Sequence, residues 1–223
     1  MELSPLIISL KTSLLATVIT FFAGLFAAHK VARLRHLKGQ LDGIFTLPMV
    51  LPPTVVGFFL LLLFGKNSLI GRLLGLFDAS VVFSWSATVI AAVTVSFPMM
   101  YRTACGAFEQ LDPNLVYAAR TLGLCESRIF WRIIVPNCRG GIAAGAVLAF
   151  ARALGEFGAT MMIAGNIPGR TQTMSTAIYS AVQAGNREQA YRWVAVIVIL
   201  SFAIMLLMNR FNRGFKQAIP RIE

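Results

Sequence analysis

Charge is scarce in this sequence of 223 residues: Asp, Glu, Lys and Arg together make up 13% of it, about half the share in a soluble domain. Hydrophobic residues make up 57%, and uncharged runs recur along the whole length. No stretch between these runs is long enough for a separate globular domain. The sequence therefore excludes an ordinary soluble protein and predicts a single transmembrane domain over residues 1–223.

Residues typical of catalytic and cofactor sites are also few. Two histidines leave little material for a metal site or a Ser/His/Asp triad. The three cysteines, Cys105, Cys125 and Cys138, form no CxxC pair, and we expect reduced thiols. The nearest approach to a P-loop, Gly65-Lys66-Asn67, has Leu60 where the first glycine belongs. We therefore expect neither a cofactor nor an enzyme, and any energy from ATP must come from a partner.

Acidic residues number nine against twenty Lys and Arg, which gives a net charge of +11. In a soluble chain this excess would suggest nucleic acid, but membrane proteins concentrate Lys and Arg in their cytoplasmic loops. Alternate loops between the apolar runs hold 13 and five Lys and Arg. The positive-inside rule therefore predicts an outside N-terminus and a cytoplasmic C-terminus, and nucleic acid is not needed to explain the charge.

Apolar runs of membrane length recur five times. Crossing about 30 Å of hydrocarbon takes roughly 20 helical residues. The runs cover residues 6–28, 44–65, 80–101, 140–165 and, more briefly, 193–208. A further apolar segment, 173–184, is too short to span and is predicted to be a re-entrant or interfacial helix. The predicted fold class is an all-α transmembrane bundle of about five spans plus one re-entrant helix.

Two of these runs contain residues that a simple anchor would not need. Pro48, Pro52 and Pro53 predict a kink in the second run, which either lines a path or is a static feature of packing. In the fourth run, Arg152 and Glu156 are spaced i, i+4 and are expected to share one helix face. Ionisable groups inside a membrane seldom face lipid, so this pair lines a pathway or forms a structural ion pair. These four residues, Arg152, Glu156, Pro52 and Pro53, are the candidates for a translocation path.

The longest polar stretch, residues 102–139, has helical content of its own. A first short helix is expected between a cap at Asp112 and a terminating glycine, Gly123. A second is expected over about residues 126–134, ended by Pro136. Two short helices at the cytoplasmic face would form a docking surface for another protein, or a hairpin that only covers the bundle.

A motif in this stretch resembles a known signature. Tyr117-Ala118-Ala119, then Gly123, then Ile133-x-Val135-Pro136 is similar to the EAA motif of binding-protein-dependent ABC importer permeases. That motif has Glu-Ala-Ala, Gly and Ile-x-Leu-Pro at the same spacings, so Tyr117 replaces the acidic residue and Val135 the leucine. The resemblance implies a coupling helix that fits a groove on a cytoplasmic ATPase. It implies this role for the following residues: Tyr117, Ala118, Ala119, Gly123, Ile133, Val135 and Pro136.

Three further segments, residues 51–57, 149–160 and 166–169, resemble the molybdate permeases of this family. The resemblance implies an ABC type I importer (MetI-like) permease fold in the bacterial inner membrane. It also implies a homodimer with cytoplasmic ATP-binding subunits and a periplasmic or extracellular molybdate-binding protein. Sulfate/thiosulfate or tungstate permeases are the nearest alternatives. An ATP-independent secondary transporter would be expected to show inverted repeats, and we see none in the sequence.

Overall fold

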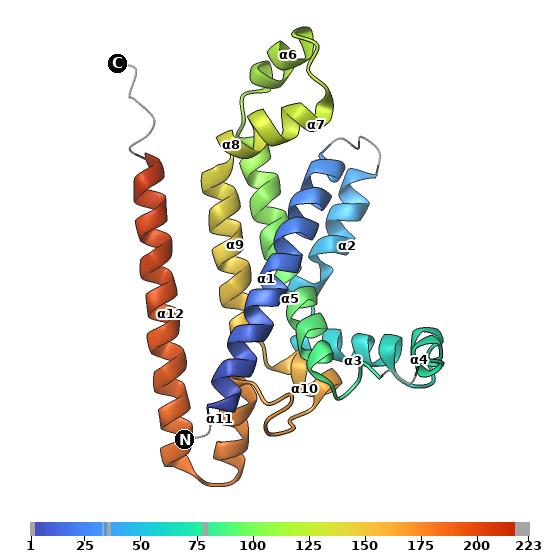
Figure 1. The fold of residues 1–223 in the computed structure, drawn as a ribbon, viewed down its shortest axis with the longest axis vertical. Coiled ribbons are helices and arrows are strands. Elements are labelled where there is room, and N and C mark those ends of the chain that lie inside the picture. The colour runs from blue at the N-terminus through green and yellow to red at the C-terminus, as the bar shows by residue number, and fades with distance from the viewer. Residues whose placement is uncertain (1–2, 33, 35–36, 78–79, 217–223) are drawn as a thin grey trace.

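Every regular element is a helix in the part of the chain that the computed structural model describes, residues 3–216 without 33, 35–36 and 78–79. Three long helices, α1 (Ser4–Val31), α5 (Trp85–Glu109) and α9 (Arg139–Leu154), pack side by side as the centre of the bundle. A fourth, α12 (Arg187–Lys216), lies at one side (Figure 1). Only 11% of the membrane-length window of α12 is buried, against 50% for α5. Helix α12 is therefore a peripheral helix and α5 a central one.

Small residues set the distance between α9 and α5. A Cβ added to Gly141 would lie 2.6 Å from the Cβ of Ala107, and one added to Gly145 would lie 3.1 Å from Met100 Sδ. Ala149, one turn further along, is fully buried. Lipid tails are as apolar as side chains, so helices in a bilayer gain most from such close packing. The structure thus explains the glycine and alanine spacing at the start of α9.

The second apolar run forms two helices, so the prediction of one continuous kinked helix over 44–65 is wrong. Helix α2 (Lys38–Val50) contains Pro48 but ends before Leu51, and α3 (Pro53–Phe64) leaves it at a bend of 111°. Leu51 is extended because a following proline disfavours the helical conformation. Pro53 occupies the first position of α3, where a missing N–H costs nothing.

The fourth run is also divided, so the predicted single span over 140–165 is wrong. Helix α9 ends at Leu154, and after a break at 155–157 the short α10 (Gly158–Ala164) begins. Toward its own start, α9 continues the helical segment Glu126–Asn137 at a bend of 78°. Three helices are long and apolar enough to span, or up to five spans if each bent pair counts as one. The prediction of an all-α transmembrane fold is confirmed, and the predicted number of about five spans is the upper end of the range of three to five candidate spans.

Two other runs have shifted ends. Helix α5 begins at Trp85 rather than Ser80, because the preceding segment turns back at Phe83 (φ 60°) and Phe83 N–H donates to Ile163 O at 3.1 Å. At its other end α5 continues to Glu109, beyond the predicted end at Tyr101. Helix α12 is much longer than the predicted 193–208.

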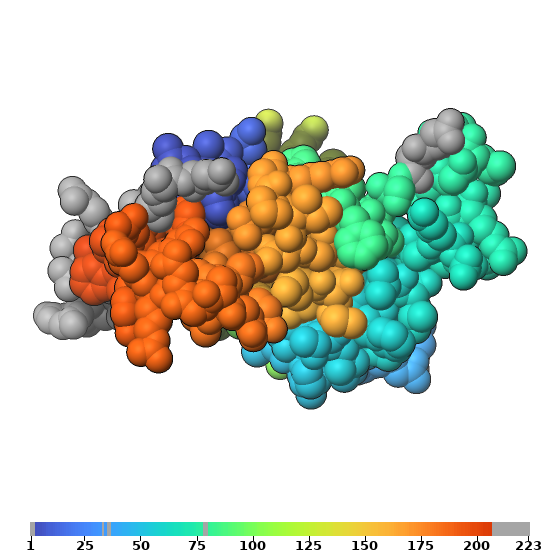
Figure 2. Space-filling view, turned by 90° about the horizontal axis from the view of Figure 1, so that it is seen from below, coloured from blue at the N-terminus to red at the C-terminus, as the bar shows by residue number. Residues whose placement is uncertain are grey.

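A short helix over residues 173–184 is confirmed. Helix α11 (Met174–Gln183) is capped by Thr173, whose side chain and that of Thr176 form a reciprocal capping box. It lies against α12 and touches α1, at the end of the bundle where α1 begins (Figure 1). Figure 2 looks onto this end and shows α3 and α4 (Leu69–Gly75) extending to the side opposite α12.

Candidate functional site

The predicted helices of the 102–139 stretch form one unit at the end of the bundle opposite α11 (Figure 1). It consists of α6 (Pro113–Thr121), α7 (Glu126–Ile129), the π-helical turn η1 (Phe130–Ile134) and α8 (Val135–Asn137). We call residues 112–138 the α6–α8 unit. Residues 102–109 belong to α5 instead, so the polar stretch is partly a continuation of a bundle helix.

Local motifs define both ends of α6. The Asp112 carboxylate accepts from Asn114 N–H at 2.9 Å, as expected of a cap. At the other end, Gly123 has a φ of +73°. Gly123 N–H donates to Arg120 O at 2.9 Å and Leu124 N–H donates to Ala119 O at 3.2 Å, which is the Schellman arrangement. The predicted cap and terminating glycine are both confirmed.

Pro136 does not end the second helix, so that prediction is wrong. The helix passes through Pro136 and continues to Asn137, because it widens into η1 just before the proline. Val135 N–H donates to Phe130 O, five residues back. A proline ring normally clashes with the carbonyl four residues earlier, and a π-helical turn relieves that clash.

Phe130 attaches the α6–α8 unit to the bundle. Its ring is buried, with its centroid 4.0 Å from the His29 ring and 6.2 Å from the Phe108 ring. The neighbouring Ile129 is fully buried. These contacts pack the unit against α1 and α5.

The opposite side of the unit is exposed. Tyr117, Leu122 and Trp131 present large apolar or aromatic surfaces to solvent. The other residues of the predicted motif are divided: Ala118, Gly123 and Pro136 are exposed, Ile133 and Val135 are half-buried, and Ala119 is buried. Exposed aromatic side chains beside arginines are typical of protein interfaces.

An ion pair closes the turn between α6 and α7. Arg120 Nε lies 2.7 Å from Glu126 Oε1, and both side chains are exposed. The hydrogen bond and the charge of Glu126 raise the pKa of Arg120 above its ordinary value. Arginine is charged at neutral pH in any case, so the pair orients the two helices and does not act as a switch.

The second candidate region is the crossing of α3 and α10, where the two breaks meet. A Cβ added to Gly57 would lie 2.7 Å from Ala159 Cα, and one added to Gly158 would lie 3.0 Å from Pro53 Cβ. The backbones therefore touch at Gly57, where a side chain would overlap Ala159, and Gly158 leaves little room for one. Pro53, a candidate path residue of the second apolar run, therefore lies against the start of α10. Helix α10 follows Arg152 and Glu156, the candidates of the fourth run.

Glu156 lies beyond the end of α9, so the predicted shared helix face is wrong, but the predicted pair forms. Glu156 Oε2 accepts from Arg152 Nη1 at 2.7 Å, and Glu156 Oε1 accepts from Ala159 N–H at 2.8 Å. The Glu156 side chain is 2% exposed and that of Arg152 is 29% exposed. Both carboxylate oxygens are thus occupied, and Glu156 holds the start of α10 as well as the guanidinium. Sequence reasoning missed this second contact.

Arg152 keeps donors available for a ligand. A guanidinium has five N–H groups in a planar fork, which suits the oxygen atoms of an oxyanion. Glu156 neutralises part of its charge, so an anion beside Arg152 would be held weakly enough to leave again. Within the described ranges, no three His, Cys, Asp or Glu side chains come together as a possible metal site.

Comparisons with known proteins agree with this geometry. The family model described as "Binding-protein-dependent transport system inner membrane component" matches residues 20–219. The molybdenum transport system permease protein ModB of Escherichia coli K12 is 41% identical over 212 residues, 94% of this chain and 93% of that protein. ModB of Haemophilus influenzae is 39% identical over 222 residues, 98% and 97% of the two chains.

Solved structures share the fold at low sequence identity. A chain of the MetNI methionine ABC transporter in an inward-facing conformation has a TM-score of 0.76 at 14% identity, covering 94% of both chains. A bacterial ABC transporter involved in import of the acidic polysaccharide alginate has a TM-score of 0.74 at 16% identity, covering 95% of this chain and 79% of that one. The predicted MetI-like permease fold is confirmed.

Proposed function

Because the chain belongs to the family of binding-protein-dependent transport system inner membrane components, we propose that it is the permease subunit of an ATP-driven molybdate importer. The assignment of molybdate as the substrate rests on one observation, the similarity along nearly the whole chain to proteins named as molybdenum transport permeases. The family description itself places the chain in a transport system of the inner membrane that depends on a binding protein.

A separate cytoplasmic ATPase would dock on the α6–α8 unit. Tyr117, Leu122 and Trp131 supply the exposed apolar contacts, and Gly123 sets the angle between α6 and α7. The buried Phe130 then links this surface to the bundle. The coupling residues proposed are those of the EAA-like motif: Tyr117, Ala118, Ala119, Gly123, Ile133, Val135 and Pro136.

A second copy of the chain would cover the face of α9 that carries Arg152. Leu148, Ala151 and Gly155 are exposed on this helix or just after it. Arg152 lies about 20 Å along α9 from Arg139, well inside an apolar layer of about 30 Å. A guanidinium facing lipid there costs roughly 2.5–3.5 kcal/mol, which a water-filled path between two copies would avoid.

In this mechanism Arg152 contacts the passing oxyanion and Glu156 positions Arg152. Closure of the ATPase subunits on ATP brings the two α6–α8 units together, and the attached bundles rock about the dimer axis. The break at Pro52 and Pro53 turns α3 away from the end of α2. The translocation path can therefore open at this break without disrupting the hydrogen bonds of a continuous helix. The N-terminus is taken to be outside and the C-terminus cytoplasmic, as the loop charges predict.

Uptake of radiolabelled molybdate tests the proposal. Vesicles containing the chain with its cognate ATPase and binding protein should accumulate the anion only with ATP. Excess unlabelled molybdate should abolish uptake, and sulfate should have little effect. Strong competition by sulfate would favour a sulfate permease, stronger competition by tungstate a tungstate permease, and uptake without ATP a secondary transporter.

The coupling surface needs a separate test. Tyr117→Asp and Leu122→Asp place charges on exposed positions, so insertion and folding should be unchanged while ATP-driven uptake is lost. Cys125→Ser, also exposed in the same unit, is the matched control and should transport normally. Normal uptake by both aspartate variants would contradict the docking assignment.

A further inference from the structure

The segment between α2 and α5 forms an arm that extends sideways from the bundle (Figures 1 and 2). After the 111° bend, α3 leads through a corner at Gly65 into α4; we call residues 53–77 the α3–α4 arm. Ser68 Oγ accepts from Gly71 N–H at 2.8 Å, and a Cβ on Gly71 would overlap the Gly65 carbonyl. The corner is therefore a fixed backbone contact that requires glycine.

The outer part of the α3–α4 arm is covered with exposed apolar side chains. Leu69, Leu73, Leu76 and Phe77 are between 61% and 83% exposed. Helix α2 has 13 residues, about 20 Å of rise, so the bend lies within an apolar layer of about 30 Å. The arm thus starts inside this layer, and its exposed leucines are placed to stay in contact with acyl chains.

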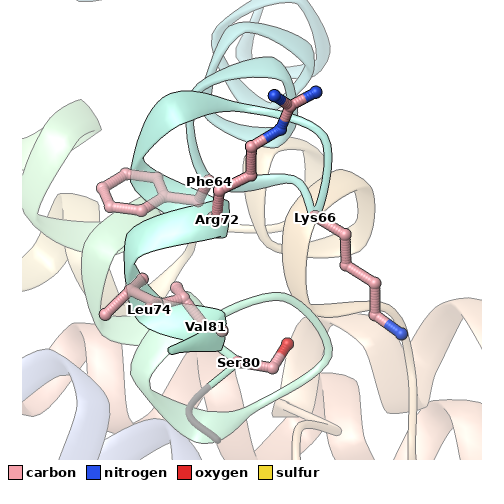
Figure 3. A pocket seen from close by; sticks show the side chains of 8 residues that line it. Phe64, Lys66, Arg72, Leu74, Ser80 and Val81 are labelled. Carbon is pink, nitrogen blue, oxygen red and sulfur yellow. The ribbon is translucent and has the colours of Figure 1, made fainter. Parts of the chain in front are cut away.

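A cavity of about 370 Å³ lies at the corner of the arm, and two cationic residues, Lys66 and Arg72, are among those that line it. Figure 3 shows Lys66 and Ser80 on one side of it and Leu74 and Phe64 on the other, with Arg72 extending outward. Neither Lys66 nor Arg72 has an ion pair or side-chain hydrogen bond to another residue in the described part of the chain. Asp78, the one acidic residue between 66 and 80 in the sequence, lies outside the described residues.

The charges at this end indicate what the cavity would take. Of the described carboxylates there, Glu156 is buried against Arg152 and Glu188 is paired with Arg192. A second copy of the chain therefore offers these cations no unpaired described carboxylate. A lipid joins an anionic headgroup to apolar chains, so it matches cations beside leucines of the apolar layer better than a water-soluble protein does.

We propose that the cavity binds the headgroup phosphate of an anionic phospholipid through Lys66 and the Ser80 hydroxyl, with Arg72 at its outer rim as a second cation beside the headgroup. The acyl chains of that lipid then cover Leu69, Leu73, Leu76 and Phe77. The α3–α4 arm, which starts inside the apolar layer, is in this way held against lipid from the acyl chains to the headgroup. This inference goes beyond the transport function and does not depend on which anion is carried.

Lipid retention tests the site. The full chain is reconstituted in nanodiscs of phosphatidylcholine mixed with phosphatidylglycerol and then released into detergent. The lipids that it retains are identified by native mass spectrometry. Each cation near an anionic surface contributes about a fivefold preference, so Lys66→Gln with Arg72→Gln should lower phosphatidylglycerol retention by more than tenfold. Arg170→Gln, an exposed arginine at the same end but outside the cavity, is the control and should retain the lipid. Equal retention by the double variant would overturn the proposal.

A spin label reports the position of the arm independently of lipid affinity. In a Cys125→Ser background, a label at Leu73→Cys should be accessible to oxygen and protected from a water-soluble nickel complex. A label at Ile167→Cys, in the exposed loop at the same end, should show the reverse. Access of the nickel complex to position 73 would show that the surface faces water. Loss of binding-protein capture by the Lys66→Gln, Arg72→Gln variant, with unchanged lipid retention, would assign the surface to a protein instead.

Discussion

The α6–α8 unit and the crossing of α3 and α10 both contain predicted site residues, but different forces hold them. The unit is built from caps and turns between near neighbours, such as Asp112 with Asn114 and Gly123 with Arg120. The crossing is built from contacts between distant segments, Gly57 against Ala159 and Gly158 against Pro53. Damage to the crossing should therefore unfold the bundle, whereas damage to the unit should stay local.

The largest effect is expected at Glu156. Glu156→Ala leaves the Arg152 guanidinium and the Ala159 N–H without their partner, and breaking a buried pair costs about 3–5 kcal/mol. The free energy of unfolding, measured by denaturant titration of the purified protein, should fall by that amount. Glu188→Ala removes an exposed i, i+4 pair with Arg192 and is the matched control. Similar losses in both variants would contradict the role of Glu156.

Exchanging the two charges should not restore stability. In the double variant Arg152→Glu, Glu156→Arg the exchanged side chains could still form an ion pair, but a guanidinium at position 156 could not accept from Ala159 N–H. The exchange should therefore be nearly as unstable as Glu156→Ala by the same titration. Full recovery would mean that the ion pair alone holds the break between α9 and α10.

Gly57 should show a smaller loss. The methyl group of Gly57→Ala would meet Ala159 backbone atoms, and overpacking of this kind costs about 1–3 kcal/mol. Gly43→Ala, in α2 with nothing near its added Cβ, is the control and should leave the thermal midpoint unchanged or slightly higher, because alanine favours a helix over glycine. Equal midpoints for the two variants would show that α3 and α10 can separate freely.

A substitution at Gly123 should affect only the α6–α8 unit, in contrast to substitutions at the crossing of α3 and α10. Gly123→Ala forces a side chain into a φ of +73°, at a cost of about 1–2 kcal/mol. Hydrogen exchange should speed up in α6 and remain unchanged in α5 and α9. Gly106→Ala, in open space on α5, should leave exchange in α6 unchanged. Faster exchange throughout the bundle would contradict the independence of the unit.

The smallest effect is expected at the exposed Arg120–Glu126 pair. Glu126→Gln should leave the thermal midpoint unchanged, because solvent screens such pairs. The folded-state pKa of Arg120 is raised, so any contribution is fully present below the ordinary arginine pKa and is lost only above the raised one. Thermal midpoints of the parent chain and the variant should therefore run parallel over roughly pH 6–9. If the two thermal midpoints diverge in that range, another titrating group must interact with the Arg120–Glu126 pair.

Much of the α6–α8 unit could be predicted because its signals are local. A capping aspartate acts on an N–H two residues away, and a terminating glycine acts on carbonyls of the preceding turn. The resemblance to importer permeases, drawn from the motif around Ala118 and Ala119, is confirmed by the family match. Pro136 failed as a helix end because a π-helical turn is a rare alternative that no single residue specifies.

The crossing could be predicted only in part. Pro48, Pro52 and Pro53 indicated a kink, but not that the helices would divide or that their breaks would meet. Likewise, the i, i+4 spacing of Arg152 and Glu156 predicted the pair for the wrong reason, since Glu156 lies outside the helix. No pattern in the sequence indicated that the Glu156 carboxylate would also accept from Ala159 N–H.

The sequence by itself determined the membrane class, the approximate spans and the caps of α6, since hydropathy and capping act over one or a few helical turns. Only the tertiary structure decided where helices break and which glycines are indispensable. A proline or glycine frees backbone groups, and whether the helix bends or ends depends on the partners those groups find on another helix. At the crossing those partners come from distant segments, Pro53 and Gly57 on one side and Gly158 and Ala159 on the other.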